Sequence, residues 1–169
     1  MFVLGIDPGL SRCGYGGVRR TGGQMRAVTG GVVRTDPAMA LPERLRLLHD
    51  ELGALVAEHG PDAVAVERVL FQTNARTAMA TGQAAGVALL AAAESGCPVV
   101  QYSANEVKMA LVGYGAATKE QVQRMVAAVL GLTEPPRPPD VADALALAVC
   151  HLGAGGLRTA IEAAAGVVP

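Results

Sequence analysis

The first third of the chain alternates short apolar runs with turns that contain glycine. Residues 2–6 are apolar and end at Asp7, directly before a Pro-Gly turn, which places Asp7 at the carboxyl end of a buried strand. Residues 14–18 and 28–34 lie on either side of a Gly-Gly turn. They predict two further strands, so this region is expected to form an antiparallel meander.

The hydrophobic period changes to helical spacing after Pro42, where leucines recur every three or four residues up to Gly60. Strands are then predicted at 63–67 and 98–102, with helices at 74–94, from 119 onwards and at 141–152. Thr118 to Gln121 has the form of a capping box at the start of one of these helices. A meander followed by strand–helix units predicts an α/β fold, with a mixed five-stranded sheet flanked by helices and the first and fourth strands at its centre.

Composition limits the classes of protein to which this chain can belong. A chain of 169 residues with 51% hydrophobic and 17% charged residues is expected to fold as a single domain over residues 1–155, with a loosely ordered tail at 156–169. A net charge of −1 excludes a uniformly basic nucleic-acid binder. Three widely spaced cysteines without a CxxC pair suggest a reducing, cytoplasmic location. The longest apolar or glycine run, residues 84–93, is too short to cross a bilayer about 30 Å thick.

Four carboxylates lie at the ends of buried elements. Asp7 and Glu67 end apolar strands, and Asp140 and Asp143 open the last predicted helix on one face of its first turn. If all four converge, their burial requires bound cations, because uncompensated buried anions are costly. Oxygen ligands without a nearby His or Cys favour Mg²⁺ or Mn²⁺.

Each carboxylate also has a purely structural explanation. Asp7 before Pro-Gly suits an Asx turn, and Glu67 suits the first solvated position after a strand. Asp140 suits a helix N-cap, and Asp143 suits a first-turn acid that complements the helix dipole. The case for a joint site rests on topology, because adjacent parallel strands bring their carboxyl ends to one edge of a sheet.

Several short blocks, collinear over about 150 residues, resemble the RuvC Holliday junction resolvases. An opening Gly-Ile-Asp-Pro-Gly alone is also similar to the phosphate loop of actin-like ATPases, but those folds need two such domains. The blocks are Leu4-Gly5-Ile6-Asp7-Pro8-Gly9, Gly14-Tyr15-Gly16, Val66-Glu67-Arg68-Val69 with Asn74, Gly82-Gln83-Ala84, Val107-Lys108, Val112-Gly113, Lys119-Glu120-Gln121-Val122 and Asp140-Val141-Ala142-Asp143-Ala144-Leu145-Ala146.

The resemblance implies an RNase H-like fold and a homodimer that cuts four-way DNA junctions by paired symmetric nicks, in recombination and repair. It assigns Asp7, Glu67, Asp140 and Asp143 as catalytic carboxylates. They would hold two Mg²⁺ ions, which Mn²⁺ is expected to replace. Two cations about 3.5–4 Å apart could bracket one scissile phosphate and leave 5′-phosphate products. The resemblance also implies a branch-migration complex of RuvA and RuvB as a partner.

Candidate DNA contacts follow from the same resemblance. Lys108 and Lys119, the only lysines of the chain, match basic positions near the site, and Arg76 and Asn74 are expected to join them. Phe71 is either a local core plug or a wedge that stacks on an unpaired base at the crossover. The alignment of this loop with the family leaves open whether Leu70 or Phe71 is that wedge.

Gly82 and Gly86 leave a smooth strip on a predicted helix, which could pack on the chain's own sheet or pair across a dimer. The family usually has an arginine where this chain has Ala85. This departure affects some of the dimer or DNA contacts that the resemblance implies. Three alternative functions remain at this point: another RNase H-like nuclease, a catalytically silent junction-binding protein, and an actin-like nucleotide-binding fragment.

Overall fold

A five-stranded mixed sheet forms the centre of the computed structural model, which describes residues 1–69 and 75–164, with side chains for 1–69 and 77–153. The strand order is β3-β2-β1-β4-β5. The strands are β1 (Phe2–Asp7), β2 (Arg12–Thr21), β3 (Gln24–Arg34), β4 (Ala63–Glu67) and β5 (Val99–Tyr102). The first three pair antiparallel, whereas β1 with β4 and β4 with β5 are parallel. The prediction of a mixed sheet with β1 and β4 at its centre is confirmed.

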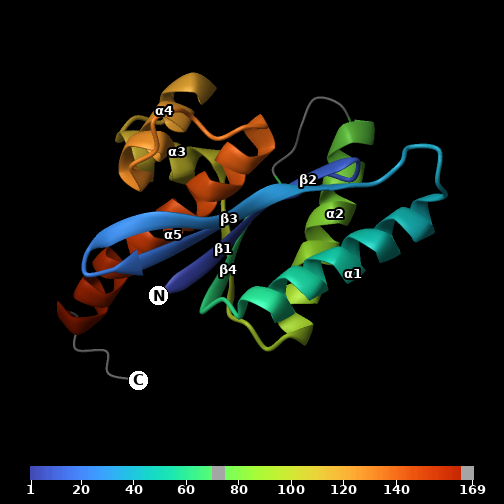
Figure 1. Cartoon of the computed structure of the whole chain (residues 1–169), viewed down its shortest axis with the longest axis horizontal. Coiled ribbons are helices and arrows are strands. Elements are labelled where there is room, and N and C mark those ends of the chain that lie inside the picture. The colour runs from blue at the N-terminus through green and yellow to red at the C-terminus, as the bar shows by residue number, and fades with distance from the viewer. Residues whose placement is uncertain (70–74, 165–169) are drawn as a thin grey trace.

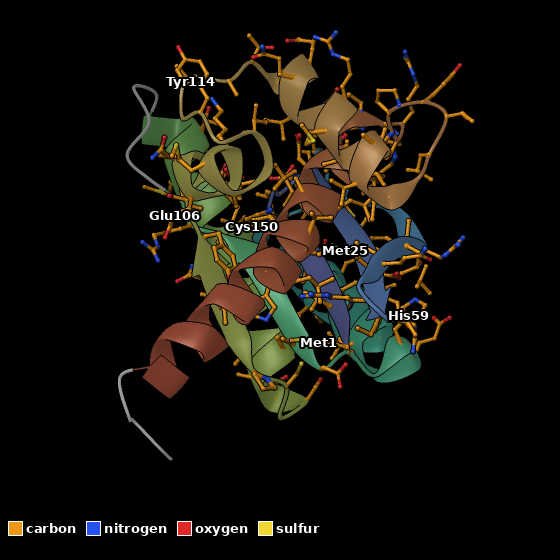
Figure 2. The ribbon with its side chains drawn as sticks, turned by 90° about the vertical axis from the view of Figure 1, so that its left-hand side faces the viewer. Met1, Met25, His59, Glu106, Tyr114 and Cys150 are labelled. Carbon is orange, nitrogen blue, oxygen red and sulfur yellow. The ribbon has the colours of Figure 1, made fainter. Side chains whose placement is uncertain are left out.

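Helices cover both faces of the sheet (Figure 1). On one face lie α1 (Leu41–His59) and α2 (Ala75–Glu94), packed on the side chains of Leu4, Ile6 and Val64. The other face carries α3 (Ala104–Val112), α4 (Lys119–Leu130) and α5 (Pro139–Ala164). In Figure 2, α5 passes in front of the sheet with Met25 of β3 beside it. None of the described helices is long and apolar enough to span a membrane.

Two helices differ from the sequence prediction. The helix α5 continues to Ala164, so its predicted end at Leu152 is wrong: the glycines at 153–156 lower helix propensity but do not end the helix. Residues 165–169 lie outside the described residues. The helix α3 was not predicted, although Ser103 and Glu106 form a capping box. The capping box of Thr118 and Gln121 is confirmed.

Glycines on the sheet allow α5 to approach closely. A Cβ on Gly5 would collide with the carbonyl oxygen of Ala144, and a Cβ on Gly14 would collide with that of Asp140. Because Asp7 is opposite Gly14 in the β1–β2 ladder, the same close approach brings the start of α5 next to the end of β1. The glycine-rich segment of β2 thus allows α5 to pack closely on the sheet.

Candidate active site

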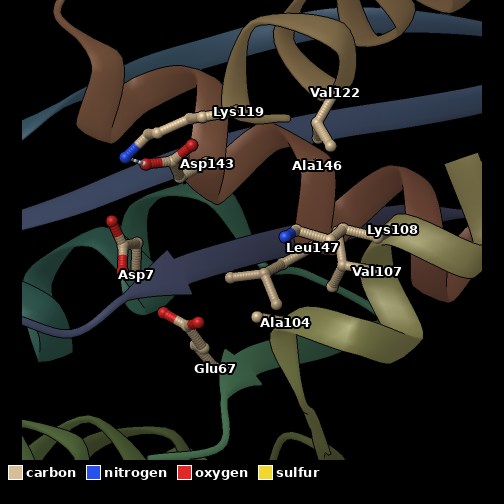
Figure 3. A pocket seen from close by; sticks show the side chains of 10 residues that line it. All are labelled: Asp7, Glu67, Ala104, Val107, Lys108, Lys119, Val122, Asp143, Ala146 and Leu147. Carbon is tan, nitrogen blue, oxygen red and sulfur yellow. Dashed lines mark ion pairs between the residues drawn. The ribbon is translucent and has the colours of Figure 1, made fainter. Parts of the chain in front are cut away.

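A pocket of about 300 Å³ lies at the carboxyl ends of the two central parallel strands. Asp7 projects into it from the end of β1 and Glu67 from the end of β4, while Asp143 enters from near the start of α5 (Figure 3). Three of the four predicted carboxylates therefore line one cavity. The other lining residues are Lys108, Lys119, Ala104, Val107, Val122, Ala146 and Leu147.

Asp7 carries the strongest electrostatic perturbation in this pocket. Burial, followed by a hydrogen bond with Glu67 and the charges of Glu67 and Asp143, raises the pKa of Asp7 to about 8. The nearby ammonium of Lys119 acts in the opposite direction. The protein therefore gathers negative charge where burial penalises it, which is a frequent property of functional sites.

Asp143 is neutralised by a lysine of the same pocket. Lys119 Nζ lies 2.5 Å from Asp143 Oδ2, an ion pair between the starts of α4 and α5. Partial burial alone would lower the pKa of Lys119, but the bond to Asp143 and the charges of Asp143, Asp7 and Asp140 raise it. Lys108, on α3, also lines the pocket. The structure thus brings both lysines to the carboxylates, as predicted.

Asp140 has a different partner and is not among the residues that line the pocket. Its Oδ2 accepts a hydrogen bond of 2.5 Å from the Arg12 guanidinium, and its pKa is lowered by that bond. Sequence reasoning missed Arg12, which is 128 residues away in the chain and looks like an ordinary polar residue at the start of a strand. No local pattern links the two residues.

The predicted DNA contacts that follow β4 lie outside the part of the chain that the structure describes. Leu70, Phe71 and Asn74 lie outside the described residues, and so does the side chain of Arg76. Their predicted DNA contacts, including the choice of wedge, stay predictions.

The outer face of α2 decides between the two explanations for its glycines. Among the described residues, a Cβ on Gly82 or Gly86 would meet no atom within 4 Å, so the predicted packing of these glycines on the chain's own sheet is wrong. Met79 and Leu90 lie at helical spacing from these glycines and are 66% and 52% exposed. Ala85 is buried, 5% exposed, and does not belong to this face.

Comparison with known proteins decides the family. The family model described as crossover junction endodeoxyribonuclease RuvC matches residues 3–151. The chain belongs to the RuvC family. A RuvC from Salinispora arenicola is 56% identical over 166 residues, covering 98% of this chain and 95% of that protein. The match includes the strands and helices that carry all four predicted carboxylates.

Solved structures agree with the RuvC fold. The structure of T. thermophilus RuvC in complex with Holliday junction substrate superposes with a TM-score of 0.89 at 41% identity, covering 94% of this chain and 97% of that one. The yeast mitochondrial Holliday junction resolvase Ydc2, at 13% identity and a TM-score of 0.63 over 89% of this chain and 78% of that one, shares the fold. The fold is RNase H-like, as the resemblance implied.

RuvC nucleases depend on divalent metal ions, and the donor set of this pocket fits a hard cation, because its donor groups are carboxylates. Within the described ranges, no group of three or more His, Cys, Asp or Glu is arranged to hold one ion. Such a group is not required: Mg²⁺ is usually held by one or two carboxylates, with water and substrate phosphates as its other ligands. Asp7 beside Glu67 meets that requirement.

Proposed function

We propose that this RuvC chain resolves Holliday junctions by paired, symmetric nicks, and that its active site is the pocket of Asp7, Glu67 and Asp143. The observation that carries the proposal is the meeting of three carboxylates and two lysines at the carboxyl ends of β1 and β4. The RuvC relative from T. thermophilus, with the same fold, has a Holliday junction as its substrate. A silent junction binder would not require this set of groups, and an actin-like nucleotide site would need two such domains.

The reaction is hydrolysis of a phosphodiester bond. Water adds to phosphorus in line with the leaving oxygen, the bond to the 3′ oxygen breaks, and the products carry a 5′-phosphate and a 3′-hydroxyl. Asp7, Glu67, Asp140 and Asp143 would hold two Mg²⁺ ions, with Mn²⁺ as a substitute. Such ions activate the attacking water and stabilise the leaving oxygen. Lys108 and Lys119 would bind, as point charges, the phosphates on either side of the bond that is cut.

A homodimer is expected to form through the outer face of α2. Nicking two strands symmetrically needs two active sites related by a two-fold axis. RuvC proteins act as dimers, and the exposed Met79 and Leu90 with the open glycines between them offer an apolar, closely approachable surface for a second copy. Arg76, at the start of the same helix, and the segment of Leu70, Phe71 and Asn74 would then contact the junction.

The remaining proposals do not rest on the geometry of the site. A role in recombination and repair and cooperation with a RuvA and RuvB branch-migration complex follow from the family resemblance, whereas a cytoplasmic location follows from the three widely spaced cysteines. The nuclease domain is proposed to span residues 1–155.

The direct test uses a mobile four-way junction and a linear duplex of the same sequence, each incubated with the purified protein in Mg²⁺ and in EDTA. We expect symmetric, ligatable nicks in the junction, in Mg²⁺ only. Equal cutting of the duplex would favour a different RNase H-like nuclease. Binding of the junction without cutting in either condition would favour the silent binder.

A further inference from the structure

Arg12 holds Asp140 through two contacts on the same carboxylate. One terminal nitrogen donates to Oδ2 at 2.5 Å, and Nε donates to Oδ1 at 3.4 Å. The two side chains are 40% and 23% exposed, so solvent reaches the pair. This forked geometry is the one that guanidinium groups also use to bind phosphate.

The two carboxylates at the start of α5 are therefore neutralised by different cations. Asp143 is paired with Lys119 and faces the pocket, whereas Asp140 is paired with Arg12 and does not line it. A divalent cation that binds Asp140 must compete with the guanidinium for the same oxygens. After that exchange, Arg12 is a free cation at the start of β2, beside Asp140.

We propose that Arg12 is a cation-exchange residue: it occupies Asp140 in the metal-free protein, is displaced when a divalent cation binds Asp140, and then binds a phosphate of the DNA. This inference rests on the proposed function, because it takes Asp140 as a metal ligand. Partly exposed ion pairs are weak, so the competition lowers metal affinity by only about two- to fivefold. Arg12 thus couples metal loading to DNA binding without blocking the metal.

The first test measures Mn²⁺ binding to the full chain without DNA, from the loss of the free-ion signal in electron paramagnetic resonance. Arg12→Gln should bind Mn²⁺ about two- to fivefold more tightly than wild type. The matched control is Arg34→Gln, since Arg34 is exposed, pairs with Arg12 in the β2–β3 ladder and changes the net charge equally. Arg34→Gln should leave the affinity unchanged. If Arg12→Gln binds Mn²⁺ no more tightly than wild type, the proposed exchange is overturned. The only role of Arg12 would then be to hold the start of α5 on β2.

A double-mutant cycle localises the effect. In an Asp140→Asn background, Arg12→Gln should no longer change Mn²⁺ affinity; a persisting gain would mean that Arg12 acts through general charge. Arg12→Lys, which keeps the charge but loses the fork, provides a second variant if Arg12→Gln fails to fold. It should bind Mn²⁺ with an affinity between those of wild type and Arg12→Gln, and tighter binding than Arg12→Gln would contradict the competition.

The second test measures junction affinity against salt concentration, in Ca²⁺ and in EDTA. Loss of one phosphate contact lowers the slope of log K against log salt by about 0.9. Arg12→Gln should show this loss in Ca²⁺ and keep the wild-type slope in EDTA, where Arg12 is engaged by Asp140. An unchanged slope in both conditions would overturn the phosphate contact. Mn²⁺ binding is measured without DNA, so a failure of junction cleavage by wild type is distinguishable from a failure of this inference.

Discussion

Asp7 and Glu67 lie side by side because Ile6 pairs with Val66 in the parallel ladder of β1 and β4. Each carboxylate follows directly after its paired residue, where the strand leaves the apolar core. The sheet thus forces two acids together at one edge, and the close packing of α5 on glycines adds Asp143. The cost of this gathered charge is visible in the raised pKa of Asp7.

The first prediction concerns that cost. Asp7→Asn should stabilise the protein in EDTA by about 1–3 kcal/mol at neutral pH. Because the pKa of Asp7 is raised to about 8, folding at that pH has to protonate a carboxyl group that is ionised in the unfolded chain, whereas Asn carries no such cost. Urea unfolding monitored by circular dichroism measures the change. Glu51→Gln, an exposed acid on α1, is the charge-matched control and should change stability by less than about 0.5 kcal/mol. A destabilised Asp7→Asn protein would show that the folded protein compensates the carboxyl group of Asp7 favourably.

A second prediction concerns the glycines beneath α5. Gly5→Ala should destabilise the protein by about 1–3 kcal/mol or more, since its Cβ has to displace the backbone of Ala144. Gly53→Ala is the control, because Gly53 lies within α1 and an added Cβ would meet no described atom within 4 Å. It should raise stability by about 0.5–1 kcal/mol through helix propensity. Thermal unfolding of the two variants compares them, and similar shifts in one direction would contradict the packing argument.

Stability should also depend on pH through His49. Bonds to Glu94 and Asp50 raise the pKa of His49, so its contribution is fully present below about pH 6.5 and is lost as the pH rises through the folded-state value. Because the pair of His49 with Glu94, between α1 and α2, is exposed, His49→Gln should cost only about 0.2–1 kcal/mol at pH 5.5 and close to nothing at pH 9. Urea titrations at both pH values measure this.

The matched control for His49 is Glu94→Gln, which should reproduce the same pH profile by removing the other half of the pair. A His49→Gln deficit of equal size at both pH values would mean that the histidine contributes by packing alone.

The α2 surface gives a prediction about assembly. Leu90→Glu should convert the dimer into a monomer at micromolar concentration, because it places a charge on the proposed apolar contact. Val129→Glu, a similarly exposed position on α4, should leave the dimer intact. Sedimentation velocity compares the two. A dimeric Leu90→Glu protein would place the contact elsewhere.

Much of the fold could be predicted from the sequence, because its signals are local. The apolar run that ends at Asp7 and the run that ends at Glu67 each specify a buried strand with an acid at its end. The capping box at Thr118 was equally clear. The same signal at Ser103 and Glu106 was present but overlooked, and it would have given α3 and with it the wall of the pocket that carries Lys108.

The partners of Asp140 and Asp143 could not be predicted, because they depend on contacts between distant parts of the chain. Asp143 meets Lys119 only once α4 and α5 pack together, and Asp140 meets Arg12 only once β2 lies under the start of α5. Spacing along the sequence placed both acids on one face of a helical turn. Tertiary contacts then gave them different cations.

The central claim is that the pocket of Asp7, Glu67 and Asp143 hydrolyses junction DNA. Single-turnover cleavage of a four-way junction in Mg²⁺ by Asp7→Asn, beside wild type and with both proteins saturating, tests it most directly. We predict junction affinity within about threefold of wild type and cleavage at least about 100-fold slower, because the loss of a metal ligand removes several kcal/mol of transition-state stabilisation. Cleavage by Asp7→Asn at the wild-type rate would contradict the account.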